Sequence, residues 1–245
     1  MATGYEPLNT LKEIGKNIWI VDAPVIKFYG MPFTTRMTVM RLQNGDLMLH
    51  SPCAICDELK QAVSALGTVK HLISPNWIHY AYIYQWAVAF PDAISWASPN
   101  VRKRAEKYQS DVVFDRDLSA LAETDWAHEV EQMIVPGSKV HEEVVFFHKA
   151  SETLILTDLI ENFEPKHVPW WFRPIIKLAG ISDPDGQMPC DMRMTFRAGR
   201  KKLRGAIEAM IGWGPKQIIV AHGRWYDRNA VAELRRAFRW VLTQD

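Results

Sequence analysis

The stretch HLISPNWIHYAYIYQW, residues 71–86, begins like a buried strand and ends like a helix. Residues 69–74, VKHLIS, form a short segment with Val69, Leu72 and Ile73 as its apolar residues, Pro75 and Asn76 favour a turn, and apolar side chains then recur at helical spacing from Tyr82 onward. A strand that runs directly into a helix is a building unit of α/β proteins. The stretch therefore predicts an α/β fold with His79 at a strand-to-helix corner.

Strands and helices alternate irregularly on both sides of this corner. Strands are predicted at 17–24, 34–42, 46–52, 69–74, 93–99, 144–148, 153–158 and 217–222, with a tight hairpin turn at Asn44–Gly45–Asp46. Helices are predicted at 55–66, 82–90, about 192–212 and 231–241. The order indicates one α/β domain, residues 1–245, with mixed sheets covered by helices.

The composition excludes several classes of protein. Hydrophobic residues make up 48% and charged residues 23% of the 245, as in ordinary globular domains. A formal net charge of +1 gives no global attraction to nucleic acid or to an anionic membrane, so we expect no nucleic-acid partner. The basic segment FRAGRKKLRGA, residues 196–206, is interpreted as a solvated helix face.

The cysteines and the apolar runs indicate a soluble, cytoplasmic protein. No run approaches the ~20 apolar residues of a membrane span, and the first residues lack the pattern of a secretory signal. Three cysteines are too few, and odd in number, for a disulfide framework. Cys53 and Cys56 have CxxC spacing without a second pair, so we interpret them as small apolar residues packed at a helix start.

Three polar side chains stand at or just beyond the ends of apolar strands: His79, Asp158 and His222. Ligands in α/β proteins gather beyond the carboxyl ends of strands, and a buried Asp or His there must be hydrated, paired or bound to a metal. His141, just before the strand 144–148, could join them. Such donors suit Zn²⁺, Mn²⁺ or Fe²⁺, although each side chain could instead cap a backbone group.

Two segments resemble the metallo-β-lactamase-fold superfamily. VVFFHKASETLILTDLI, residues 144–160, is similar to that family's strand, turn and strand that end in a metal-bridging aspartate, which implies this role for Asp158. IIVAHG, residues 218–223, resembles the late strand that ends in the last metal histidine, which implies this role for His222. The resemblance spans roughly residues 15–225 and implies a four-layer αββα sandwich with mixed β-sheets.

The opening metal signature of that family, HxHxDH, is missing from this chain. At its expected place stand Pro75, Asn76, Trp77, Ile78, His79 and Tyr80. His50 likewise stands where the family usually has an aspartate. We therefore identify the chain as a member of a divergent branch of this fold.

The resemblance implies a reduced site rather than a dinuclear zinc centre. His79, Asp158 and His222 could hold one divalent metal ion, with His141 as an optional fourth ligand. Three protein ligands plus water are typical of catalytic zinc, and the metal lowers the pKa of the water toward ~7. The chain would then be a hydrolase of a small ester, thioester, lactone or phosphodiester.

A general acid or base would also be needed, and Asn76, Tyr80 and Asn162 are the candidates. The competing hypothesis is a metal-free binding or scaffold protein that retains the fold. Asp158 and His222 would then form a hydrogen-bonded pair, with His79 capping the corner. Fold alone does not separate these functions.

The segment PWWFRPIIKLAG, residues 169–180, has several interpretations. It is expected to expose Trp170, Trp171 and Phe172 beside Arg173 and Lys177. As a flap, it would cover the crevice and exclude water. Trp next to Arg and Lys also favours a peripheral membrane contact over Trp170–Lys177. The tryptophans could equally pack into a small separate core or against the partner in a homo-oligomer.

Overall fold

The strand-to-helix corner lies inside a seven-stranded mixed sheet in the computed structural model, which describes residues 5–243. The strands follow one another in chain order: β1 Leu11–Gly15, β2 Ile18–Phe28, β3 Met31–Arg41, β4 Asp46–His50, β5 Thr68–Ser74, β6 Ile94–Ala97 and β7 Arg116–Asp117. Neighbours from β1 to β4 are antiparallel and those from β4 to β7 are parallel.

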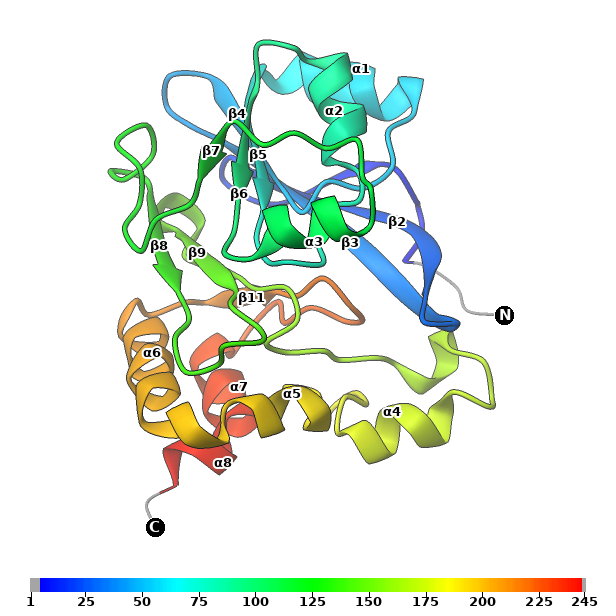
Figure 1. Ribbon diagram of the computed structural model, residues 1–245, viewed down its shortest axis with the longest axis vertical. Coiled ribbons are helices and arrows are strands. Elements are labelled where there is room, and N and C mark those ends of the chain that lie inside the picture. The colour runs from blue at the N-terminus through cyan, green and yellow to red at the C-terminus, as the bar shows by residue number, and fades with distance from the viewer. Residues whose placement is uncertain (1–4, 244–245) are drawn as a thin grey trace.

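A four-stranded sheet faces the first one (Figure 1). Its strands are β8 Val130–Ile134, β9 Val144–His148, β10 Thr153–Ile155 and β11 Gln217–Ile219, in the order β11-β10-β9-β8. β10 runs parallel to β11 and antiparallel to β9. Apolar side chains from both sheets form the core between them, among them Met40 and Trp96 on one side and Phe146 and Ile155 on the other.

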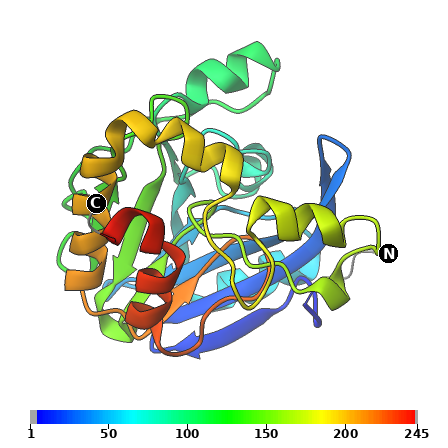
Figure 2. The same cartoon turned by 90° about the horizontal axis from the view of Figure 1, so that it is seen from below.

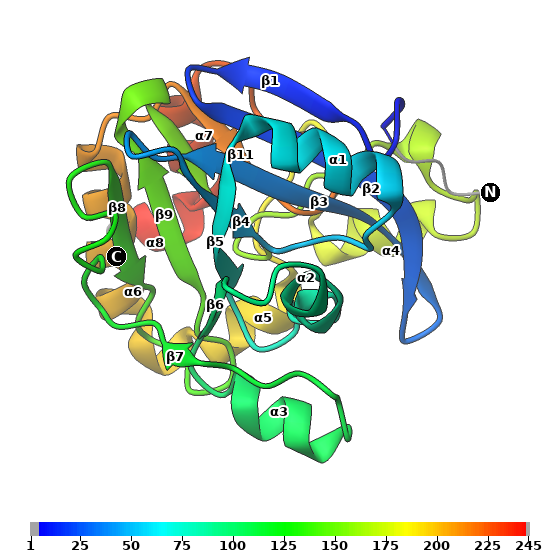
Figure 3. The ribbon, with the colours of Figure 1, turned by 90° about the horizontal axis from the view of Figure 1, so that it is seen from above.

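Helices cover the outer faces of both sheets. On the first sheet lie α1 Asp57–Leu66, α2 Ile83–Ala89 and α3 Val101–Lys107 (Figure 3). The remaining helices are α4 Arg173–Ala179, α5 Cys190–Thr195, α6 Arg200–Gly212, α7 Ala230–Ala237 and α8 Arg239–Leu242, of which α6 to α8 cover the second sheet (Figure 2). Single 3₁₀ turns occur at Lys149–Ser151, Pro165–His167 and Arg197–Gly199. The four layers confirm the predicted αββα sandwich.

Both predicted hairpins are present. Gly45 takes a positive φ of 89° between β3 and β4, and the Asn44 side chain accepts the Asp46 N–H. The second hairpin joins β9 and β10 as predicted, but β10 ends at Ile155, three residues before Asp158. Residues 156–158 thus leave the sheet, which places the Asp158 carboxylate in a loop instead of a strand.

Two predicted helices are each divided in the structure. The helix predicted at 192–212 is α5, a 3₁₀ turn and α6. Gly199 lies so close to Gly137 at the break that a Cβ there would come 2.1 Å from the Gly137 carbonyl oxygen. The helix predicted at 231–241 is α7 followed by α8, with the buried Phe238 between them. β1, β7 and β8 were not predicted because charged and polar residues interrupt or replace the apolar ones in these segments.

The cysteines pack as expected. Cys53 is buried, which raises the pKa of its thiol to about 12, and Cys56 directly precedes α1. Among residues 5–243, no helix combines the length and the apolar character that a bilayer span requires. The predicted domain limits of 1–245 include residues 1–4 and 244–245, which lie outside the described range.

Candidate metal centre

The three strand-end side chains meet at one point. His79 follows β5, Asp158 follows β10 and His222 follows β11. The Nε2 atoms of His79 and His222 each lie 3.1 Å from Oδ1 of Asp158. All three side chains are at least nine-tenths buried, and their possible ligand atoms lie within 4.8 Å of one another. The three side chains that the sequence places beyond strand ends therefore lie together, although His79 follows a strand of the seven-stranded sheet and the other two follow strands of the four-stranded sheet.

A buried glutamate holds the loop that carries Asp158. Both carboxylate oxygens of Glu143 accept backbone N–H groups, from Thr157 at 2.7 Å, Asp158 at 2.8 Å and Leu159 at 3.2 Å. The side-chain amide of Asn76 donates to Oδ2 of Asp158 at 2.6 Å. With Oδ2 occupied in this way, Oδ1 is directed at the two imidazoles.

The SPNWIH turn orients His79. Oδ1 of Asn76 accepts the N–H groups of Ile78 at 2.9 Å and His79 at 3.1 Å, as expected of an Asn in a tight turn. Nδ1 of His79 lies 2.7 Å from the Ser51 hydroxyl oxygen. Since Nδ1 is engaged there, Nε2 is the ring nitrogen that faces Asp158.

The β3 strand orients His222 from the opposite side. Nδ1–H of His222 donates to the Thr34 carbonyl at 2.6 Å, and the Gly223 N–H donates to the Thr34 hydroxyl. Arg36, buried beside Asp22, donates to the carbonyls of Val220 and Gly223. A hydrogen bond from Nδ1 to a carbonyl leaves Nε2 as the metal-binding nitrogen, the arrangement usual for metal-ligating histidines.

The Asp158 carboxylate and the neighbouring imidazoles stabilise each other's charged forms. Burial by itself would raise the pKa of the Asp158 carboxyl, but the charge of His79 and hydrogen bonds from both imidazoles hold it well below its ordinary range. Burial would lower the pKa of His222, but its hydrogen bond to the Asp158 carboxylate raises it above the ordinary value. A metal would have to displace the proton at Nε2.

The donor set fits a small divalent ion. Bonds of about 2.0–2.1 Å to a tetrahedral zinc put neighbouring ligand atoms about 3.3 Å apart, close to the two 3.1 Å separations found here. Two imidazoles and one carboxylate also suit Mn²⁺ and Fe²⁺. Three protein ligands leave one position open, as in catalytic zinc sites.

His141, predicted as an optional fourth ligand, contacts Trp77 and Glu143 through its two ring nitrogens. Its Nδ1 accepts the Trp77 indole N–H at 3.3 Å, and its Nε2 lies 3.4 Å from Oε2 of Glu143. Burial would lower the pKa of His141, but the Glu143 carboxylate raises it. His141, Glu143 and Asp158 form a second group of close donor atoms, separate from the two other histidines.

The three predicted acid–base candidates take different positions. The Asn76 side chain is fully buried and orients Asp158 and the turn. Tyr80 packs against the apolar cluster between the first sheet and its helices and does not line the cavity beside the centre. The Asn162 amide donates to Asp183 and to the Arg224 carbonyl, so it secures the loop after His222.

A largely apolar cavity of about 640 Å³ adjoins the centre. His79, Asp158 and His222 line one wall. The other walls are mostly apolar and come from the β2–β3 hairpin, the turn after β5, α4 and the start of α5, including Phe28, Met31, Ile78, Phe172, Ile181 and Met192. Such a cavity can bind a small molecule with an apolar body.

Sequence reasoning missed two buried glutamates. Glu143 is described above, and Glu161 lies in the cavity wall, where burial raises the pKa of its carboxyl to about 8. Among the described residues, no group hydrogen-bonds to its Oε2 atom. The only sequence signals were short spacings, with Glu143 two residues after His141 and Glu161 three after Asp158.

His50 does not replace the aspartate that the resemblance expects at its position. It belongs to neither group of close donor atoms among the described residues. Burial, together with the charge of His79, lowers its pKa to about 3, and its ring meets that of Phe146 edge-on. His50 is therefore a neutral core residue.

Solved structures of the same fold match almost the entire chain. A metallo-beta-lactamase from Pontibacter korlensis superimposes with a TM-score of 0.64 at 14% identity, covering 96% of this chain and 99% of that one. FIM-1 from Pseudomonas aeruginosa, in its mono-zinc form, gives 0.63 at 11% identity, with 96% of each chain covered. The enzyme from Hirschia baltica gives 0.62 at 10% identity, covering 96% of this chain and 98% of that one. At such identities the likeness establishes the fold alone.

None of the curated proteins matches the sequence. A family model does match, over residues 16–179, and its description is "Domain of unknown function (DUF4336)". The matched range includes the SPNWIH turn and Asp158 but ends before His222. The chain, a divergent protein of the metallo-β-lactamase fold, therefore belongs to the DUF4336 family.

Proposed function

We propose that the protein is a metal-dependent hydrolase that uses one divalent ion. The observation that carries this proposal is the convergence of two Nε2 atoms on one carboxylate oxygen at the wall of an apolar cavity. Both imidazoles are fixed at Nδ1, by Ser51 and Thr34, so their orientation does not depend on the metal. Such preorganisation is expected of a metal site rather than of a chance ion pair.

The ion would be held by His79, Asp158 and His222, and it would polarise a substrate oxygen and lower the pKa of a water molecule. The apolar walls would exclude bulk water and hold the body of the substrate. Burial raises the pKa of the Glu161 carboxyl in the cavity wall to about 8 in the metal-free protein, so Glu161 is the candidate proton donor to a leaving group.

The mono-zinc form of FIM-1, a protein of the same fold, supports the idea that this architecture can hold a single metal ion. The alternative is a metal-free binding protein. It is favoured by the pairing of Asp158, whose carboxylate accepts a hydrogen bond from Asn76 at Oδ2 and lies 3.1 Å from the Nε2 atoms of both imidazoles at Oδ1. The two proposals predict different metal contents for the purified protein.

Metal analysis of the purified protein, reconstituted in turn with Zn²⁺, Mn²⁺ and Fe²⁺, separates them. Wild type is expected to retain one ion per chain through gel filtration, whereas Asp158→Asn and His222→Ala should retain little. His128→Ala, at an exposed histidine outside the centre, is the matched control and should behave as wild type. The loaded protein is then assayed on esters, thioesters, lactones and phosphodiesters with and without chelator.

Wild type that binds none of the three ions would contradict the hydrolase proposal. Equal metal retention by His222→Ala and wild type would show that the ion lies elsewhere in the molecule. The first result would favour the metal-free binding protein, whose cavity should then take up ligand regardless of chelator, and the second would contradict the assignment of the ligands.

A further inference from the structure

The α4 segment presents a second apolar face to solvent. Ile175 and Leu178, at i and i+3, lie on one side of the helix and are exposed, and Trp171, in the turn just before the helix, is exposed as well. Trp170, just before the helix, is 79% exposed and Leu178 is 84% exposed. Phe172, which was predicted to be exposed, is instead buried with Ile176 on the opposite side, because that side packs against the cluster around Phe163.

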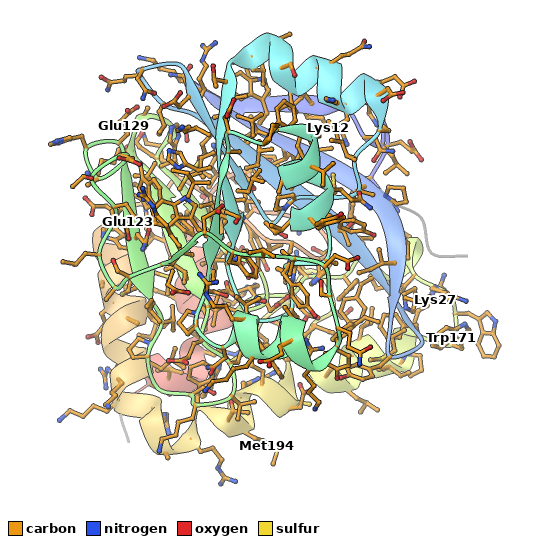
Figure 4. The ribbon with its side chains drawn as sticks, turned by 45° about the horizontal axis from the view of Figure 1, so that its top comes forward. Lys12, Lys27, Glu123, Glu129, Trp171 and Met194 are labelled. Atoms are coloured by element: carbon orange, nitrogen blue, oxygen red, sulfur yellow. The ribbon has the colours of Figure 1, made fainter. Side chains whose placement is uncertain are left out.

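The tip of the β2–β3 hairpin extends this exposed surface. Tyr29 is 74% exposed at the tip, beside Lys27. Met31 and Phe33 of β3 pack against the buried side of α4, so the hairpin and the helix are neighbours. Figure 4 shows the side chains of Lys27 and Trp171 at the same corner of the molecule. We call this surface the rim; it comprises Lys27, Tyr29, Trp170, Trp171, Arg173, Ile175, Lys177 and Leu178.

The rim is positively charged although the chain is nearly neutral. Neither residues 24–36 nor residues 165–181 contain an Asp or a Glu, whereas the chain as a whole balances 29 basic against 28 acidic residues. Lys27, Arg173 and Lys177 are exposed, and none of them forms an ion pair with another described residue. Their charges are therefore available to an external anion.

The cavity opens at the rim. Tyr29 and Ile175 both line the cavity and are both exposed, so part of its mouth lies between the hairpin tip and α4. The exposed residues that border the rest are Ala81, Val140, Cys190 and Asp191. Deeper in, Phe28, Met31 and Phe172 continue the apolar surface toward the metal centre. An apolar molecule that left a lipid phase at the rim would thus meet apolar side chains along its path.

We propose that the rim docks on the surface of an anionic lipid bilayer. Trp170, Trp171 and Leu178 would enter the boundary between headgroups and acyl chains, where exposed aromatic and apolar side chains of peripheral proteins insert. Lys27, Arg173 and Lys177 would contact lipid phosphates. This proposal does not depend on the metal centre or on any catalytic activity.

A second copy of the chain fits the rim less well. The commonest dimer is two-fold symmetric and places the same patch of both subunits face to face. Three unpaired cations would then oppose three others without an acidic residue from either rim segment to compensate. An anionic bilayer supplies the missing negative charge.

Co-sedimentation with phosphatidylcholine vesicles that contain roughly one third phosphatidylserine tests the proposal. Wild type should pellet with these vesicles and much less with pure phosphatidylcholine. Trp170→Ser/Leu178→Ser should lower the partition coefficient about tenfold or more, and Lys27→Glu/Lys177→Glu should do so on anionic vesicles only. Matched controls are Val113→Ser/Leu121→Ser, at apolar residues 78% and 77% exposed elsewhere, and Lys201→Glu/Lys202→Glu on the basic part of α6.

Because every substituted residue is exposed, we expect all variants to have the wild-type melting temperature. Equal melting temperatures would establish that each variant is folded. Wild type that pellets no more than it does without vesicles would overturn the proposal. So would a loss of binding in the α6 variant but not in the rim variants. Sedimentation velocity that finds a wild-type dimer, dissociated by Trp170→Ser/Leu178→Ser, would instead make the rim a subunit interface.

Discussion

Two buried carboxyl groups three residues apart carry opposite protonation states. Asp158 keeps its negative charge because two imidazoles and the Asn76 amide compensate its burial. Glu161 has no hydrogen-bond partner for Oε2 among the described residues, so burial dominates and the pKa of its carboxyl rises. Such a pair, one anion and one acid, is typical of sites that need both a metal ligand and a proton donor.

The raised pKa of Glu161 predicts a pH-dependent stability in the chelator-treated protein. The pKa rises from 4.5 to about 8 on folding, so between these values the folded state binds more protons than the unfolded state. The free energy of unfolding therefore falls as the pH rises through this window and is flat above it. Glu161→Gln, which mimics the neutral acid, should match wild type at the acid end and exceed it by a few kcal/mol at the alkaline end.

Urea denaturation at both ends of the window measures this difference. Asp227, an exposed carboxylate, provides the control, because Asp227→Asn should change stability little at either end. A Glu161→Gln effect that is the same at both ends would mean that the carboxyl ionises normally in the folded protein.

At the scale of elements, the centre depends on how closely three loops approach one another. Gly223 takes a φ of +86°, and a Cβ there would come 2.1 Å from the Asn162 carbonyl oxygen. The loop after β11 can therefore place the His222 side chain in the centre only because residue 223 is a glycine. The Asn162 N–H and the His222 carbonyl form the neighbouring hydrogen bond.

Gly223→Ala should accordingly destabilise the protein by about 3 kcal/mol or more, since it adds both a strained backbone and a clash with backbone atoms. Gly205→Ala is the matched control, because Gly205 lies inside α6 with no atom within 4 Å of its would-be Cβ. That change should stabilise by about 0.5–1 kcal/mol. Chemical denaturation measures both, and a mild effect at Gly223 would show that the loop can move away from Asn162.

At the scale of the molecule, the centre connects the two halves of the sandwich. His79 follows a strand of the seven-stranded sheet, whereas Asp158 and His222 follow strands of the four-stranded sheet. Arg36 also joins the two sheets, from β3 to the carbonyls of Val220 and Gly223. A ligand that binds all three side chains would therefore oppose separation of the sheets.

Metal should thus raise the melting temperature of the entire domain in one step. At a hundredfold excess over Kd a ligand adds about 2.7 kcal/mol, which corresponds to a shift of roughly 5–10 °C for a chain of this size. Calorimetry with and without Zn²⁺ measures the shift, and Asp158→Asn should abolish it. An unchanged wild-type melting temperature in saturating Zn²⁺, Mn²⁺ and Fe²⁺ would argue against the centre.

Much of this architecture was predictable from local patterns. The hairpin at Asn44–Asp46, the corner at SPNWIH and the hairpin before Asp158 each have a turn residue or an apolar run that marks them. The division of the basic helix at Gly199 had no such mark. Its cause is the contact with Gly137, more than sixty residues earlier in the chain.

The sequence by itself determined an α/β domain with mixed sheets covered by helices and the three side chains at or just beyond the ends of its strands, because apolar periodicity and strand ends are local properties of the chain; the four-layer αββα arrangement was implied by the family resemblance. Only the tertiary structure decided what surrounds them: Glu143 beneath the Asp158 loop, Thr34 against His222, Glu161 in the cavity wall and the exposed face of α4. Hydrogen bonding and burial depend on which distant segments meet, and no local pattern encodes that meeting.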